Sequence, residues 1–145
     1  MQPIDFVLLH VAATWGLVGL IWVVQLVQYP GFALVRGADF DAYHEHHCNR
    51  ISWVVATLMG TEAVTGVYLY LAPPEGTDTL ALHISLALLA LNWAITAFVS
   101  VPLHSRLRSR VRSAQGPLVA TNWIRTAAWT ARGVWAFLLL RSLLL

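Results

Sequence analysis

The sequence predicts an all-α integral membrane protein, a bundle of four transmembrane helices in up-down-up-down order. Of its 145 residues, 58% are hydrophobic and only 11% are charged, whereas an ordinary soluble domain is about 25% charged. A soluble chain of this length has too few polar side chains to cover so much apolar surface, so a lipid bilayer is the expected solvent. Four long apolar runs mark the expected spans: residues 6–29, 51–71, 80–103 and 119–145.

Turn-forming residues separate these four runs, each of which reaches the length of about 20 residues that a helix needs to cross a bilayer. Pro30-Gly31 ends the first run, residues 72–76 form a turn after the second, and residues 115–117 precede the fourth. The first run lacks a basic leader and is expected to stay in the mature protein. Without an internal repeat or a composition shift, residues 1–145 are expected to form one domain.

The segment 39–50 is expected to be helical and to run directly into the second span. At 100° per residue, one face of this helix would carry two histidines near its start and a carboxylate at mid-membrane. This stripe consists of His44, His47, Ile51, Val55, Leu58 and Glu62.

The basic residues of the loops predict the orientation of the bundle. All nine basic residues are arginines, and the loops after the first and third spans hold six of them, whereas the loop after the second span holds none. The positive-inside rule then puts the arginine-rich loops in the cytoplasm and both termini outside it. Because the arginines flank apolar segments, they indicate orientation in a membrane, and nucleic acid is not an expected partner.

Glu62 and Arg132 are expected to meet near the middle of the membrane. They lie at similar depths in the second and fourth spans, about 16 Å and 20 Å from the same face at the helical rise. A lone charge at that depth is costly, so each must find a partner. Such a pair either fixes the helix register or serves as a proton relay or as a polar anchor for a substrate. Asn92 and Thr96 of the third span are expected to join the network.

A polar cluster is expected at the cytoplasmic ends of the spans. His44 and His47 lie on one helical face, and His104 ends the third span. Two or three imidazoles near a carboxylate are suited to copper, iron or zinc, so His44, His47 and His104 form a candidate transition-metal site. The alternative is that these histidines belong to solvated helix ends.

His10 and His83 form a weaker candidate for a haem site. Both would lie about one turn below the outer face, His10 in the first span and His83 in the third. Two inward histidines at matched depth are the minimum for ligating a haem b iron between helices. The alternative is two interfacial histidines that are hydrogen-bonded to backbone or water.

Two motifs carry a family resemblance: Val101-Pro102-Leu103-His104-x-x-Leu107 and Asn122-Trp123-x-Arg125-Thr126. They resemble the small four-helix bacterial membrane proteins related to anthrone oxygenases, over the last third of the chain. His104 stands where that family usually has Asn. The resemblance implies a bacterial inner-membrane oxygenase that acts on an apolar aromatic molecule, with His104, Asn122 and Arg125 as site residues.

The leading functional prediction is therefore a small membrane oxidoreductase or oxygenase with a site near the cytoplasmic face. Arg125 would bind an oxyanion or enolate oxygen, and a histidine would act as base or metal ligand. The second prediction is a non-catalytic accessory subunit whose apolar helices contact other membrane subunits, a second copy of the chain, lipids or pigments. A solute- or proton-conducting bundle through Glu62 and Arg132 is the third.

Overall fold

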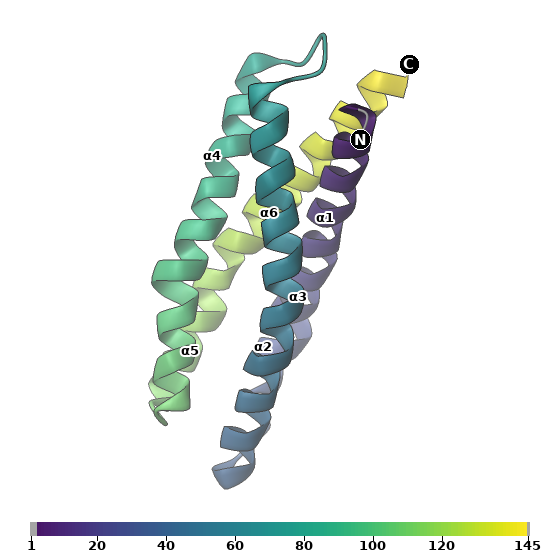
Figure 1. Ribbon diagram of the computed structural model, residues 1–145. Helices are drawn as coiled ribbons and strands as arrows, with labels where there is room; N and C mark the ends of the chain where they lie inside the picture. Colours follow the sequence, from purple (N-terminus) through teal and green to yellow (C-terminus); the bar gives the residue numbers. More distant parts are fainter. Residues whose placement is uncertain (1–2, 145) are drawn as a thin grey trace.

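The computed structural model describes residues 3–144, with the side chain of Ala38 left out, and these residues contain no β-strand. Residues 1, 2 and 145, which belong to the predicted single domain, lie outside the described part. The described chain forms four long helical rods joined by short loops (Figure 1). In chain order the helical segments are α1 (Pro3–Val23), η1 (Val24–Gln28), α2 (Tyr29–Gly31), α3 (Gly37–Leu71), α4 (Thr79–Ile95), η2 (Thr96–Ser100), α5 (Val101–Arg108), η3 (Arg112–Ala114) and α6 (Gln115–Leu144).

The first and third rods each contain a π-helical turn just before a proline. The segment η1 leads into Pro30, and η2 leads into Pro102. A proline inside a helix has no N–H to donate and its ring collides with the carbonyl four residues earlier. A widened π turn accommodates both effects without ending the rod. Each rod therefore remains helical through its proline, with Tyr29 just before Pro30 and His104 two residues after Pro102.

Local signals explain where the other helices begin. The α3–α4 loop turns at Gly76, whose φ of +77° suits glycine. Asp78 then caps α4, because its Oδ1 accepts hydrogen bonds from the backbone N–H groups of Leu80 (2.8 Å) and Ala81 (3.1 Å). At the opposite end, Gly37 starts α3 with a φ of +62°. The segment 39–50 is helical and continuous with the second span, as the sequence predicts.

The rods pack in the order α3, α1, α6, α4. The most extensive contacts are those of α1 with α3 and with α6, followed by α4 with α6, whereas α3 and α4 contact each other much less. The α3–α4 loop lies at the end where α1 begins and α6 ends, and the α5–α6 turn lies at the other (Figure 1). That second end carries the arginine-rich loop, which Arg110 ties to Asp41 of α3 through a 2.9 Å ion pair.

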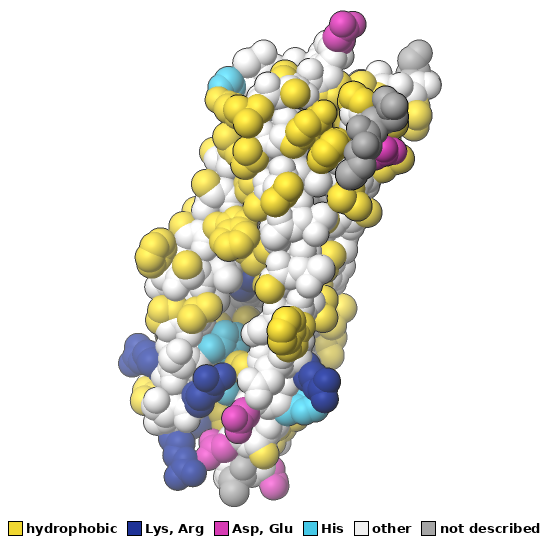
Figure 2. All heavy atoms as spheres, in the orientation of Figure 1, with side chains coloured by type: hydrophobic (Ala, Val, Ile, Leu, Met, Phe, Trp, Pro, Cys, Tyr) yellow, Lys and Arg dark blue, Asp and Glu magenta, His cyan; other side chains and the backbone are white. Residues whose placement is uncertain are grey.

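Three helical segments of the described chain are long and apolar enough to cross a membrane: Pro3–Gly31, Asp39–Leu71 and Thr79–Arg108. The rod α6 is as long but carries Arg125, Arg132 and Arg141, and it is less clearly a span than the sequence alone indicates. Apolar side chains cover much of the middle of the visible face, and charged ones gather near its ends (Figure 2). This surface is compatible with contact to a lipid bilayer.

Candidate functional site

Three metal-ligating side chains meet at the arginine-rich end of the bundle. Nε2 of His44 and Nδ1 of His104 are 3.0 Å apart, and Sγ of Cys48 lies 3.5 Å and 3.6 Å from these two nitrogens. His44 and Cys48 are one helical turn apart on α3, so both face the same way. His104 comes from α5, two residues beyond Pro102. His44 and Cys48 are buried, and His104 is half-buried.

Aromatic rings hold these histidines in place. The ring of His44 stacks on Phe40, with centroids 5.4 Å apart, and Phe32 packs edge-on against His44 and His47. His47 is buried and its ring centroid lies 6.1 Å from that of His104. His46, by contrast, is exposed. Of these three histidines of α3, His44 and His47 therefore belong to the interior of the bundle. The alternative prediction, a solvated helix end, fits only His46.

A tyrosine extends the cluster on its inner side. Oη of Tyr29 lies 3.0 Å from Nε2 of His104, so both ring nitrogens of His104 have partners. A hydrogen bond between two imidazole nitrogens needs one N–H and one lone pair. At least one ring of the His44–His104 pair is therefore neutral in this arrangement.

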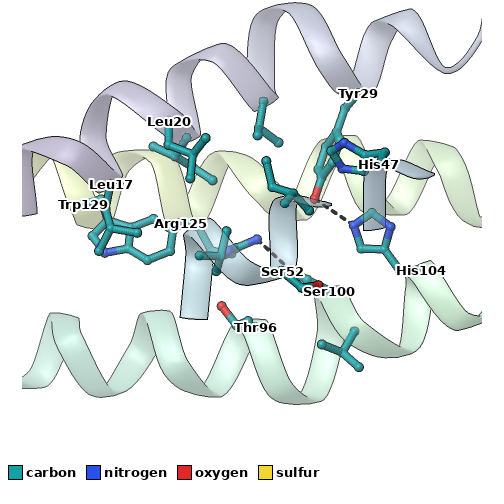
Figure 3. A pocket seen from close by; sticks show the side chains of 15 residues that line it. Leu17, Leu20, Tyr29, His47, Ser52, Thr96, Ser100, His104, Arg125 and Trp129 are labelled. Atoms are coloured by element: carbon teal, nitrogen blue, oxygen red, sulfur yellow. Dashed lines mark hydrogen bonds between the residues drawn. The ribbon is translucent and has the colours of Figure 1, made fainter. Parts of the chain in front are cut away.

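Beside the cluster lies a cavity of about 110 Å³ between α1, α3, η2 and α6 (Figure 3). This volume is comparable to that of an engineered apolar cavity of about 150 Å³ that binds benzene. Aliphatic side chains are the largest group in its wall, and the indole ring of Trp129 lies at one side. Its main polar lining residues are Tyr29, His47, Ser52, Ser100, His104 and Arg125.

Arg125 is the charged group of this cavity. It is buried, and its Nη1 donates hydrogen bonds to Oγ of Ser100 (3.2 Å) and Oδ1 of Asn122 (3.1 Å). Its guanidinium carbon lies 4.9 Å from the ring centroid of Trp129, a cation–π distance. No carboxylate of the described residues forms an ion pair with Arg125, and its Nε has no hydrogen-bond partner there.

Asn122 orients Arg125 from behind the cavity. Its Oδ1 accepts from Arg125, while its Nδ2 donates to Oε1 of Gln25 at 2.8 Å. Gln25 in turn donates to the backbone carbonyl of Val119 at 3.4 Å. Asn122 is fully buried and does not line the cavity, so it is a positioning residue for the guanidinium.

Glu62 and Arg132 form the buried ion pair that the sequence predicts, with Nε and Oε1 2.9 Å apart. Oε1 of Glu62 also accepts from Oγ1 of Thr14 at 3.0 Å, and its Oε2 accepts from Nε1 of Trp129 at 3.1 Å. Nη1 of Arg132 donates to both the carbonyl and the hydroxyl oxygen of Ser85. Both oxygens of the carboxylate are thus occupied by protein donors, an arrangement suited to fixing the register of α1, α3 and α6.

Asn92 and Thr96 do not join this network. The Asn92 side chain is fully buried, and neither its Nδ2 nor its Oδ1 has a partner among the described residues. Thr96 donates to the backbone carbonyl of Asn92 at 2.7 Å and lines the cavity near Arg125 instead. Ser85, about two turns before Asn92 in α4, supplies the third rod's contact to Arg132.

His10 and His83 do not form the inward pair that a haem site requires. His10 is buried and its Nδ1 lies 2.9 Å from Oγ1 of Thr65. His83 is exposed, with Nδ1 2.7 Å from the Thr79 carbonyl oxygen and Nε2 3.3 Å from the Tyr70 hydroxyl. The prediction that both rings face inward is wrong for His83, because its side chain is exposed. His83 fits the interfacial alternative, and His10 is a buried polar group of the bundle.

The structure also adds residues that the sequence prediction omits. Cys48 lies one turn after His44 and completes the group of three ligating atoms, a spacing visible in the sequence. Tyr29 directly follows η1, and Ser100 is the last residue of η2. A projection that assumes a regular α-helix does not predict which way these two side chains point. His47 faces the cavity and lies beside the His44–Cys48–His104 group, to which it does not belong.

No protein-family model, no curated protein and no solved structure matches this chain. The fold and the site therefore define its class by geometry: an all-helical protein with three helices able to cross a membrane and a buried polar site at its arginine-rich end. The resemblance to the proteins related to anthrone oxygenases stays a prediction from two motifs.

Proposed function

We propose that the chain is a multi-pass protein of the bacterial inner membrane, with four spans in up-down-up-down order and both termini outside the cytoplasm. The fourth span would be α6, whose two central arginines are buried inside the bundle and kept from lipid. The arginine-rich α5–α6 turn supports a cytoplasmic position for that end. The histidine cluster and the cavity would then lie just inside the cytoplasmic face.

We further propose that it is a small oxidoreductase or oxygenase-like enzyme that acts on an apolar molecule bearing an acidic hydroxyl or an enolisable carbonyl. The observation that carries this proposal is Arg125, a buried guanidinium at a largely apolar cavity with no carboxylate paired to it. A buried charge without a counter-ion is costly. A phenolate or enolate oxygen in the cavity would supply that counter-ion, and the aliphatic wall would hold the hydrocarbon part.

The residues around the cavity support one chemical step, removal of a proton from such a molecule. His47 lines the cavity, and no hydrogen bond joins its ring to another described residue, so it is free to accept the proton. The electron pair left on the substrate oxygen would face Arg125, which Asn122 and Ser100 hold in position. His104 would contact the substrate from the side of Tyr29. An electron-rich anion of this kind is the species that an oxidation by dioxygen would consume.

The proposal is tested with 4-nitrophenol, whose ionised form is yellow and small enough to suit the cavity. Purified wild-type protein in detergent should raise the ionised fraction of the bound probe, because the guanidinium stabilises the phenolate. Arg125→Gln should weaken phenolate binding by about 10–100-fold, the cost of a lost hydrogen bond to a charged group. Visible absorption titrations measure both effects.

The matched control is Arg141→Gln, which removes an exposed arginine of the same helix and should leave the titration unchanged. It also corrects for partition of the probe into the micelle. Equal phenolate affinity in wild type and Arg125→Gln would contradict the proposal.

A further inference from the structure

The three ligating atoms at the arginine-rich end are spaced as the ligands of one metal ion. The sides of the triangle formed by His44 Nε2, His104 Nδ1 and Cys48 Sγ are 3.0, 3.5 and 3.6 Å. A point equidistant from the corners of such a triangle lies about 2 Å from each, which is close to ordinary metal–nitrogen and metal–sulfur bond lengths of about 2.0–2.3 Å.

A second observation supports ligation independently of this triangle. A histidine that binds a metal through one ring nitrogen usually donates its other N–H to an oxygen that fixes the ring. Oη of Tyr29 lies 3.0 Å from Nε2 of His104 and is placed to accept that hydrogen bond. The tautomer with a lone pair on Nδ1 then faces His44 and Cys48. Stacking on Phe40 holds the His44 ring in the matching orientation.

We propose that His44, Cys48 and His104 bind a cuprous ion, with Tyr29 as the residue that positions His104. Thiolate and imidazole ligands favour copper and zinc over hard cations. The surroundings favour the lower charge, because this end of the bundle carries the arginine-rich loop and the Asp41 carboxylate is already paired with Arg110 at 2.9 Å. A cuprous ion and a thiolate together are neutral, whereas a divalent ion would leave a buried net charge.

The ion would lie at the edge of the cavity that holds Arg125. His104 is both a ligand and a lining residue, and His47 lies beside it on the cavity side. This metal site does not depend on the proposed phenolate binding, since Arg125 contributes no ligand atom.

The proposal is tested by titrating the full-length protein in detergent, under reducing conditions, with cuprous ion in competition with bathocuproine disulfonate. Wild-type protein should retain one equivalent of copper against the chelator. Cys48→Ser and His104→Asn should lose it. His46→Asn, which changes an exposed histidine of the same helix turn, should retain it. Tyr29→Phe should bind about 10–100-fold more weakly, the usual cost of losing an outer hydrogen bond to a ligand.

X-ray absorption of the copper-loaded wild-type protein tests the same site without a substitution. The chain has a single cysteine and two methionines, so one sulfur and two imidazole nitrogens around copper, taken with the loss of copper in Cys48→Ser, would identify the site. Copper without a sulfur neighbour, equal copper retention by wild type and Cys48→Ser, or retention of zinc in place of copper would overturn the proposal. Arg125→Gln should still bind copper, so failure of the phenolate proposal and failure of the copper site are distinguishable.

Discussion

At the scale of single residues, the two buried arginines of α6 differ in one respect that decides their roles. Arg132 has a carboxylate partner, Glu62, whose two oxygens accept hydrogen bonds from three side chains. Arg125 has only neutral partners and borders a cavity. Each guanidinium has one buried nitrogen without a partner among the described residues, Nη2 of Arg132 and Nε of Arg125. The difference is that the charge of Arg132 is neutralised by Glu62, whereas Arg125 has no counter-ion among these residues.

Removal of one partner of the Glu62–Arg132 pair should be strongly destabilising. Glu62→Gln leaves a buried guanidinium without its counter-ion, and breaking such a pair costs about 3–5 kcal/mol of unfolding free energy. Thermal unfolding in detergent, followed by circular dichroism, measures the loss. Glu62→Gln combined with Arg132→Met removes both charges and should recover much of the stability. Wild-type stability of Glu62→Gln, or a double variant less stable than either single one, would refute the structural role.

At the scale of helices, the sequence predicted the buried face of a helix best where that helix is regular. The rod α3 is continuous from Gly37 to Leu71, so a period of 100° per residue placed His44, His47 and Glu62 on one buried face. His104 was predicted from the sequence, but Tyr29, which directly follows η1, and Ser100, which lies in η2, were not. A π turn holds an inserted residue and rotates the rest of the rod relative to a straight helix. Cys48 lies one turn after His44 and was omitted because the predicted site was assembled from histidines alone.

Close packing between α1 and α6 makes a second prediction at this scale. A Cβ atom added to Gly133 would lie 3.0 Å from a methyl group of Val18, a buried and stiff side chain, with the Trp15 ring 3.5 Å away. Gly133→Ala should therefore destabilise the bundle by about 1–3 kcal/mol through overpacking.

Gly19→Ala is the matched control for this packing prediction. Gly19 is an exposed glycine inside α1, and nothing lies within 4 Å of an added Cβ. Its replacement should be neutral or stabilise the protein by up to about 1 kcal/mol through helix propensity. Equal unfolding midpoints for Gly133→Ala and Gly19→Ala would show that the α1–α6 contact is looser than described.

At the scale of the whole molecule, the proposed orientation rests on the six arginines at one end. Under that proposal the C-terminus is outside the cytoplasm, so a C-terminal alkaline phosphatase fusion should be active and a green fluorescent protein fusion should be dark. A variant with the arginines of the α5–α6 turn replaced by glutamine should show a weaker bias, because loop arginines set the orientation. The opposite pattern of fusion activities would reverse the orientation and move the polar site to the outer face.

The alternative role as an accessory subunit is also a statement about the whole molecule. It predicts that the chain co-purifies with a stoichiometric partner and that substitutions of His47 or Arg125 leave this assembly intact. The enzyme proposal predicts that the purified chain alone binds the phenolate. Mass measurement of the detergent-extracted complex, made beside the 4-nitrophenol titration, separates these two roles.

The central claim is that the cavity beside Arg125 binds the anion of a small apolar molecule. A crystal structure of the protein with 4-bromophenol tests it most directly, because anomalous scattering locates the bromine without ambiguity. The account predicts bromine against the aliphatic wall formed by α1 and α3, with the phenolate oxygen bound by Arg125. Bromine found only on the lipid-facing surface, or a cavity filled by rearranged side chains, would contradict it.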